Sequence, residues 1–368
     1  MKTATITFHA AHNYGSMLQA YALQQMILRL GHSNVIINLR TTRQRNLYCK
    51  PLRYRGNIFI LFLRCVFYLP FIKSLNKKYD LFEQYLKDNL LLTREFLTEN
   101  EIESANLKFD CYISGGDQIW NIAPIDFDWS YFLPFVKKGK KISYAVSMGP
   151  KGIQAQQKRG LITEYLSSYN IVGVREEGTK KILSEFLSKD IQVVLDPVLL
   201  LTKEEWCNHF DRTPIIKGRY IFMYVPMFNK QVYDLSLLIS ERLKIKVVTT
   251  TFQLKSLFYT SFEKKLEVGP CEFLNILSNA SLVISGSFHA TVFAVLFHIP
   301  FFSVGGDKDN RTSSFLNSLN LLARTISLSD WEEKINKAFY CDFSKADSIL
   351  KKERIKSIDF LKTSIENE

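Results

Sequence analysis

The chain has 368 residues, of which 46% are hydrophobic and 23% charged, a balance typical of a folded, water-soluble protein with about two domains. No uncharged apolar segment reaches the roughly 20 residues of a membrane-spanning helix, and the first residues lack the pattern of a signal peptide, so we expect a cytoplasmic protein. The six cysteines are scattered without paired spacing, which predicts free thiols and no metal site.

Positive charge is concentrated near the start of the chain. Residues 1–79 contain 12 Lys or Arg and no Asp or Glu, so they carry the whole net charge of +12. Within them, residues 41–78 join basic side chains to aliphatic and aromatic ones, which is typical of a helix that lies on an anionic membrane surface. A helical insertion packed on its own domain is the open alternative. We expect no nucleic acid partner, because no signature of nucleic-acid binding accompanies the charge.

The first elements predict alternating strands and helices. Residues 3–10 are typical of a strand, a turn leads into a helix that ends at Gly31, and residues 35–39 form the next strand, which completes a βαβ unit. A polar helical stretch follows at 79–105. Further strands, separated by helices, are expected at 111–116, 141–147, 170–175 and 191–196.

A second alternating series follows, with strands expected at 220–225, 246–251, 281–285 and 300–304. The tail after about residue 329 is expected to be helical, with Leu350, Ile355, Ile358 and Leu361 roughly periodic. Two such series predict an α/β protein with two doubly wound, Rossmann-like domains facing a cleft. We expect the domains at 1–205, with a basic and aromatic helical insertion at about 41–105, and at 206–340, followed by a helix at 341–368.

Ligands of open parallel sheets bind beyond the carboxyl ends of the strands, so the loops there are the candidates for a site. In "NYGSMLQ" (13–19), Gly15 permits an unusual backbone angle and Ser16 can cap the following helix. The same residues fit either a binding loop or a simple capping turn.

The loop "SGGDQIWN" (114–121) places Asp117, Trp120 and Asn121 after a strand. An aromatic ring beside carboxylate and amide groups suits a sugar, which it can stack on while the polar groups bind hydroxyls. A strand-end turn whose Trp packs in the core is the alternative.

Arg175 ends the strand at 170–175, where a guanidinium can hold a carboxylate or a phosphate by two parallel hydrogen bonds. An ion pair with Glu176 and Glu177 is equally open. Asp196 also follows a strand, but the Asp-Pro pair is typical of a turn.

Two histidines share the apolar run at 285–302. On one helix they point to opposite faces, roughly 13 Å apart along the axis, so they cannot share a metal. His289 stands in the first turn after a Ser-Gly-Ser loop and suits proton donation to a bound anion. His298 precedes Pro300 and caps the far end of the helix. Arg311 begins another helix and suits phosphate.

Five motifs together resemble the polysaccharide pyruvyl transferase family: "NYGSMLQAYAL", "SGGDQIWN", "GVREEG", "LDPVLLL" and "SFHATVFAVLFHIPFF". They occur in the family's order, and the resemblance runs from about residue 10 to 320. It implies a fold similar to GT-B glycosyltransferases. It also implies transfer of a pyruvate-derived group from phosphoenolpyruvate to sugar hydroxyls in surface polysaccharide biosynthesis, which forms a ketal and releases phosphate.

The resemblance implies roles for individual residues. His289 would be the general acid and Arg175 a donor-binding cation in the catalytic site. Many members carry an Arg two positions before this His, where this chain has Ser287, and we expect Arg311 to replace it. The residues expected at the donor site are Arg175, Ser285, Ser287, His289 and Arg311. Those expected on the acceptor side are Asn13, Gly15, Ser16, Asp117 and Asn121.

The implied reaction uses phosphoenolpyruvate as co-substrate and needs no cofactor. The implied acceptor is a sugar or a lipid-linked glycan at the inner membrane face, to which residues 41–78 would bind the protein peripherally. Two other classes stay open: a glycosyltransferase of the same fold that uses a sugar nucleotide, and a non-catalytic protein that binds glycans or membranes.

Overall fold

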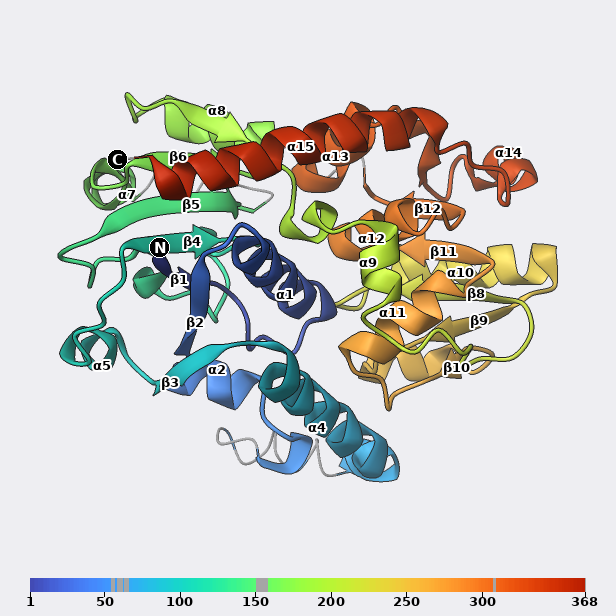
Figure 1. Ribbon diagram of the computed structural model, residues 1–368. Coiled ribbons are helices and arrows are strands. Elements are labelled where there is room, and N and C mark those ends of the chain that lie inside the picture. The colour runs from blue at the N-terminus through green and yellow to red at the C-terminus, as the bar shows by residue number, and fades with distance from the viewer. Residues whose placement is uncertain (54–56, 58–61, 63–65, 150–157, 307–308, 368) are drawn as a thin grey trace. The chain divides into compact units, whose positions relative to one another are not determined.

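The computed structural model describes residues 1–53, 57, 62, 66–149, 158–306 and 309–367 (Figure 1). Contacts between residues divide the chain into two compact units. Unit 1 comprises residues 1–49, 85–201 and 351–368, and unit 2 comprises residues 50–84 and 202–350. This grouping differs from the expected domain ranges, because residues 50–84 of the predicted insertion belong with the second unit and the last 18 residues with the first.

Unit 1 is built on a seven-stranded, all-parallel sheet in the order β3-β2-β1-β4-β5-β6-β7. Its strands are β1 (Lys2–Ile6), β2 (Ser33–Leu39), β3 (Leu92–Phe96), β4 (Cys111–Gly115), β5 (Lys140–Val146), β6 (Ile171–Val174) and β7 (Ile191–Val193). The helices are α1 (Tyr14–Arg29), α2 (Thr42–Leu47), α5 (Glu99–Ser104), α7 (Arg159–Ser167) and α8 (Glu177–Ser184), with 3₁₀-turns η3 (Trp129–Phe132) and η4 (Pro197–Leu200).

Unit 2 has a six-stranded parallel sheet in the order β10-β9-β8-β11-β12-β13. Its strands are β8 (Tyr220–Tyr224), β9 (Lys246–Thr249), β10 (Glu263–Lys264), β11 (Leu282–Ser285), β12 (Phe301–Val304) and β13 (Thr325–Ile326). The helices are α9 (Lys203–Cys207), α10 (Lys230–Leu243), α11 (Pro270–Ser278), α12 (Phe288–Leu296), α13 (Asn310–Ser318) and α14 (Trp331–Lys334). The 3₁₀-turns are η1 (Pro51–Arg53), η2 (Leu69–Phe71), η5 (Leu254–Phe258), η6 (Leu322–Arg324) and η7 (Ile335–Lys337).

Both sheets confirm the predicted doubly wound class. In each, the strand order reverses beside the first strand, between β1 and β4 in unit 1 and between β8 and β11 in unit 2. The central strands are hydrophobic on both faces because helices cover both, and all five residues of β4 and of β8 are buried. At such a reversal the loops that follow the two adjacent strands lead in opposite directions. The crevice between these loops is where ligands of open α/β sheets generally bind.

Three strands were not predicted: β3, β10 and β13. All lie at sheet edges, and β10 and β13 have two residues each. The β3 sequence, LTREF, carries two charged residues and only its last residue is buried. Edge strands lack the continuous apolar run that marks a central parallel strand, so their pattern is weak.

The helix α15 (Ser344–Glu366) confirms the predicted helical tail, and its last part completes unit 1. The Ser357 hydroxyl accepts a hydrogen bond of 3.0 Å from the backbone N–H of Leu195. The Phe360 ring lies so close to Gly173 that an added Cβ there would be 2.6 Å from it. Ile355, one of the roughly periodic residues of this tail, is 63% exposed, and Ser357 instead faces the sheet.

The basic and aromatic part of the predicted insertion, residues 41–78, forms α2, the turns η1 and η2, and the first part of α4 (Ile72–Asn89). Among its described residues, six large apolar side chains are exposed: Leu47, Leu52, Phe62, Val66, Phe67 and Leu69. Arg55 and Arg64 lie outside the described residues. Within the part of the chain that the structure describes, no helix is long and apolar enough to cross a membrane.

Candidate active site

The loop after β1 leads into α1, and Asn13 caps this helix. Its side-chain oxygen accepts hydrogen bonds from the backbone N–H groups of Gly15 (2.9 Å) and Ser16 (3.4 Å). The prediction that Ser16 is the cap was therefore wrong. Gly15 lies inside α1 and is not among the glycines with positive φ, so the unusual backbone angle expected there is also absent.

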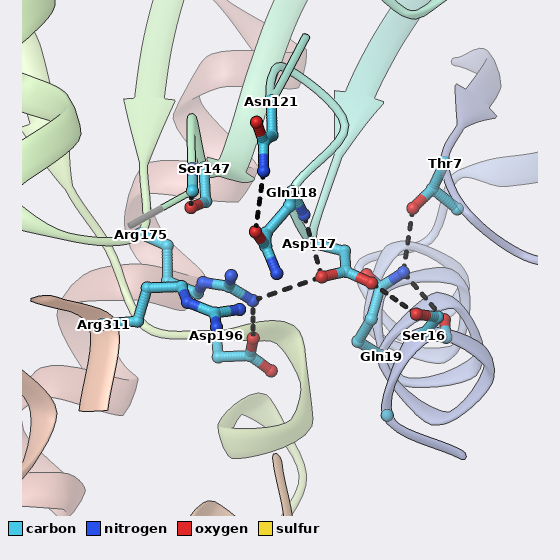
Figure 2. Close-up of polar contacts among 12 residues, drawn as sticks. Thr7, Ser16, Gln19, Asp117, Gln118, Asn121, Ser147, Arg175, Asp196 and Arg311 are labelled. Carbon is cyan, nitrogen blue, oxygen red and sulfur yellow. Dashed lines mark hydrogen bonds and ion pairs between the residues drawn. The ribbon is translucent and has the colours of Figure 1, made fainter. Parts of the chain in front are cut away.

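Because Asn13 caps the helix, the Ser16 hydroxyl can bind Asp117 instead. The two residues follow β1 and β4, the strands between which the strand order reverses. The Ser16 hydroxyl donates a hydrogen bond of 2.5 Å to the Asp117 carboxylate, and both residues are buried (Figure 2). Gln19, one turn further along α1, donates its amide N–H groups to the Thr7 hydroxyl (2.8 Å) and to the Ser16 carbonyl (2.9 Å). These contacts fix the Ser16 side chain beside the carboxylate.

The loop after β4 holds Asp117 in a backbone conformation that residues other than glycine rarely adopt. Gly116 and Asp117 have φ values of 65° and 56°. A Cβ atom on Gly116 would lie 1.7 Å from the Gln19 side-chain oxygen, so only glycine fits there. The carboxylate also accepts a 2.8 Å hydrogen bond from the N–H of Gln118. Non-glycine residues in this region occur often at functional sites, where the surrounding structure holds them in place.

Arg175, at the end of β6, lies in a buried network of ion pairs. Its guanidinium is 2.9 Å from the Asp196 carboxylate and 3.9 Å from that of Asp117 (Figure 2). It is also 3.5 Å from the Glu176 carboxylate. Burial alone would lower the pKa of Arg175, but the three carboxylates together raise it above its ordinary value. The arginine side chain is only 2% exposed. Arg175 therefore forms the ion pair that the sequence left open, but its principal partner is Asp196, and Glu176 rather than Glu177 is the glutamate that it contacts. Direct binding of the donor by Arg175 stays a prediction.

The rest of the loop after β4 splits into a polar and an apolar part. The Asn121 amide donates a 3.1 Å hydrogen bond to Gln118 and is partly exposed. Trp120 is fully buried, stacks on Phe132 and donates its indole N–H to the Tyr131 carbonyl. The interpretation of Trp120 as a sugar-stacking ring was wrong, because the ring belongs to the core of unit 1.

A small cavity lies beside this loop, at the carboxyl ends of β1 and β2. Its volume is only about 10 Å³, which is roughly the room that one water molecule needs. The polar side chains that line it include Thr7, His9, Arg40, Gln44 and Tyr48. Thr7 is also the residue that accepts from Gln19, so the cavity adjoins the Ser16–Asp117 pair.

In unit 2, the turn after β11 is closed by its own serines. The Ser285 hydroxyl donates to the Ser287 carbonyl (2.8 Å) and accepts from the Ser287 N–H (3.0 Å). Ser287 is the N-cap of α12, yet its side chain makes no capping hydrogen bond among the described residues. The first turn of α12 contains no acidic side chain. No acidic side chain in this turn competes for the positive end of the helix, and anion binding there stays a prediction.

His289 lies in that first turn, and its side chain is buried against Phe288. The residue is 7% exposed, and the two rings meet edge to face at 5.2 Å between centroids. Arg311, at the start of α13, contacts the same Phe288 ring with its guanidinium 5.9 Å from the ring centroid. Unit 2 thus brings His289 and Arg311 to one phenylalanine, while Arg175 belongs to unit 1.

Arg311 is paired with Asp309, which the sequence analysis did not single out. Two guanidinium nitrogens each lie 3.0 Å from a different carboxylate oxygen of Asp309. Burial would raise the pKa of Asp309, but Arg311 and hydrogen bonds from the Thr312 hydroxyl and the Arg311 backbone hold it below its usual value. A charged ligand at Arg311 would have to share the guanidinium with this carboxylate.

His298 caps the far end of α12, as predicted, through its backbone. It has a left-handed φ of 59°, and its N–H and that of Ile299 donate to the carbonyls of Val295 and Ala294. The imidazole ring, 2.8 Å from the Asp347 carboxylate, stacks on Phe343. His298 therefore has a structural role that is distinct from the position of His289.

Three partners in these sites were missed in the sequence: Gln19, Asp309 and the cavity residue His9. Gln19 stands three residues after Ser16 on α1, so the helical period was a signal that placed both on one face. Asp309 precedes Arg311 at a helix start, where an N-cap is expected. For His9 no local pattern existed, because its neighbours come from β2 and α2.

The fold of this chain is similar to that of known epimerases and of a glucosyltransferase. UDP-GlcNAc 2-epimerase from Methanocaldococcus jannaschii is 13% identical, with a TM-score of 0.55, and the match covers 97% of this chain and 99% of the epimerase. A putative UDP-N-acetylglucosamine 2-epimerase from Listeria monocytogenes is 12% identical, with a TM-score of 0.58 and coverage of 100% and 97%. An alpha-glucosyltransferase bound to UDP-glucose and DNA is 9% identical, with a TM-score of 0.51 and coverage of 98% and 94%. These proteins have the GT-B fold, and the predicted fold class is confirmed.

The sequence itself gives the family. No protein of curated function matches it. The family described as polysaccharide pyruvyl transferase matches residues 13–308, which include the Ser16–Asp117 pair, the Arg175 network and His289. The chain therefore belongs to the polysaccharide pyruvyl transferase family.

Proposed function

We propose that this protein transfers a pyruvate-derived group from phosphoenolpyruvate to two hydroxyls of a glycan sugar, forming a ketal and releasing phosphate. The observation that carries the proposal is the position of His289, buried in the first turn of α12 beside Arg311 and Phe288. A proton donor next to a helix start suits a substrate that is both an anion and an enol phosphate.

His289 starts the reaction by protonating the methylene carbon of the donor. The adjacent carbon, C2, then becomes cationic, and a sugar hydroxyl bonds to it and loses its proton. The bond from C2 to the phosphate oxygen breaks, phosphate leaves, and a second hydroxyl bonds to C2 to close the ketal. Of the two hydroxyl protons, one restores His289 and the other leaves with phosphate. Proton transfers and charge stabilisation account for every step, so no redox cofactor is needed.

Unit 2 has the charges for the donor. The uncapped start of α12 and the Arg311 guanidinium offer positive charge for the phosphate and the carboxylate of phosphoenolpyruvate. Hydrogen bonds between Ser285 and Ser287 hold the turn that leads into the first backbone N–H groups of α12. Arg311 is thus our candidate for the arginine that many members carry at the position of Ser287.

Unit 1 has the groups for a neutral acceptor. The Asp117 carboxylate is held by Ser16 and Gln118, so it suits the role of base for the attacking hydroxyl. Asn13, Gly15 and Asn121 shape the loops around it. Around Arg175, three carboxylates face one guanidinium, an excess of negative charge that disfavours an anionic donor at this position.

A lipid-linked glycan at the inner membrane face is the acceptor we propose. The support is the exposed apolar surface at Val66, Phe67 and Leu69, which are 53%, 45% and 62% exposed, in a part of the chain with no acidic residue before Asp80. Binding to anionic liposomes should weaken when Arg43, Arg45, Arg53 and Arg55 are replaced by Gln. Unchanged binding would refute the membrane part of the proposal.

Release of phosphate from phosphoenolpyruvate in the presence of a galactosyl or mannosyl acceptor tests the reaction. His289→Ala should lower this rate by roughly 10²- to 10⁴-fold, the usual contribution of a general acid. His298→Ala is the matched control on the same helix and should leave the rate within a few-fold of wild type. Equal rates for His289→Ala and wild type would remove the mechanism, and consumption of a nucleotide sugar instead would favour a glycosyltransferase.

A further inference from the structure

The first part of α4 lies against the loops that follow β9 and β10 in unit 2. Phe71 packs on Phe252 with ring centroids 4.7 Å apart, and the Ser74 hydroxyl donates a 2.8 Å hydrogen bond to Glu267. Leu81 lies beside Gly269, where an added Cβ would be 2.9 Å away. Residues 72–84 therefore lie at the carboxyl ends of β9 and β10, on the edge at which ligands of parallel sheets bind.

Lys78 is the charged residue that α4 turns toward this edge. Its ammonium group donates a 2.9 Å hydrogen bond to the carbonyl of Thr250, which comes directly after β9. Burial lowers the pKa of Lys78 to about 8. A nearby anion would stabilise the charged form of such a lysine.

Thr250 supplies a second, independent observation. The residue is fully buried, and its hydroxyl has no hydrogen-bond partner among the residues that the structure describes. A buried hydroxyl without a partner costs free energy, so its presence calls for a partner such as a ligand oxygen. The hydroxyl belongs to the residue whose carbonyl binds Lys78, so the two groups are neighbours.

We propose that Lys78 and Thr250 form an anion subsite in unit 2 for a phosphate group of a substrate. A phosphate oxygen can accept from the ammonium group and from the Thr250 hydroxyl at once. That the anion is a phosphate rests on the proposed function, whose donor and product both carry one. The subsite itself depends only on the contacts of α4 with β9, and it would give the basic insertion a role within unit 2.

Labelling by pyridoxal 5′-phosphate tests the site directly. This aldehyde carries a phosphate, condenses with an uncharged lysine amine with loss of water, and is fixed when borohydride reduces the imine to a secondary amine. We expect peptide mass spectrometry to find the label on Lys78 in preference to Lys77, the exposed lysine next to it on α4. Inorganic phosphate, diphosphate and phosphoenolpyruvate, added separately, should each slow the labelling, and the strongest competitor identifies the source of the phosphate.

Two variants separate a binding role from a structural one. Lys78→Met should weaken phosphate binding, measured by calorimetry, by about ten- to hundredfold, as expected for hydrogen bonds to a charged group. Thr250→Val keeps the shape and should weaken it by a few-fold, and Lys77→Met is the control that should leave it unchanged. Labelling of Lys78 that no phosphate compound slows, or a Lys78→Met protein that binds phosphate like wild type, overturns the subsite. Because none of these measurements uses turnover, they hold even if the transferase reaction is not found.

Discussion

The two units repeat one sheet topology but place opposite charge at the point where the strand order reverses. In unit 1 the Asp117 carboxylate lies at this point, 3.9 Å from the Arg175 guanidinium, which Glu176 and Asp196 also contact from the ends of β6 and β7. In unit 2 it carries serines, the start of α12 and His289, and among the described residues the nearby Arg311 guanidinium is paired with one carboxylate, that of Asp309. The fold fixes where a ligand binds, and the side chains at the strand ends decide whether that ligand is neutral or anionic.

The largest expected effect is in unit 1, where Arg175→Met leaves the carboxylates buried without their cation. We expect the free energy of unfolding to fall by about 3–5 kcal/mol, the usual result of breaking a buried ion pair. Urea unfolding measures the loss, and hydrogen exchange of β5 and β6 should place it in unit 1. Lys181→Met, at an exposed site on α8, is the control. A protein of normal stability with a raised KM for phosphoenolpyruvate would show instead that Arg175 binds the donor.

Asp117→Asn should come next. The amide has nearly the same shape and tolerates the left-handed conformation, so the loop should fold, but it cannot take a proton from a hydroxyl. We expect phosphate release in the presence of acceptor to fall by about 100-fold, with an unchanged KM for phosphoenolpyruvate. Glu177→Gln, an exposed carboxylate in the same unit, should have no effect. A change in donor KM alone would break the assignment of unit 1 to the acceptor.

In unit 2, Arg311→Met should raise the KM for phosphoenolpyruvate by about tenfold, since a hydrogen bond to a charged group is lost. Stability should change by about 1 kcal/mol or less, because the pair with Asp309 is partly exposed. Arg175→Met is thus expected to lower stability, whereas Arg311→Met is expected to raise the KM for the donor. Arg242→Met, in the last turn of α10, is the control, and an unchanged KM would remove Arg311 from the donor site.

The smallest expected effect is a pH dependence at Asp309. Its folded-state pKa is lowered, so its ion pair contributes stability above the unfolded-state value of about 3.9, and this contribution is lost as the pH falls through the folded-state pKa. Asp309→Asn should therefore be less stable than wild type near neutral pH, by about 1 kcal/mol or less, and equally stable in acid. Urea midpoints at the two pH values measure this. An equal loss at both would mean that the carboxylate acts only as a helix cap.

The sequence predicted the central strands and the cap at the C-terminal end of α12, because both depend on local patterns. A buried parallel strand appears in the sequence as an apolar run. His298 follows the last residues of a helix and precedes Pro300, which is the position of a helix C-terminal cap. The Ser16–Asp117 pair could not be predicted as a pair, since the two residues are 101 positions apart and meet only when β1 and β4 are adjacent. Trp120 was ambiguous for the same reason: the core that receives it comes from η3 and from Tyr169 on the approach to β6.

Unit 1 and unit 2 are each built from separated stretches of chain, so neither is complete until late in translation on the ribosome. Unit 1 needs Ser357 and Phe360 against its sheet, yet these residues leave the ribosome after all of unit 2. Unit 2 in turn must retain residues 50–84, made before most of unit 1. Neither unit can therefore complete its core while the chain is still short, and the usual order in which the N-terminal domain folds first is not open to this protein. Its early chain is also its most basic part, so it would emerge into the cell unfolded and positively charged.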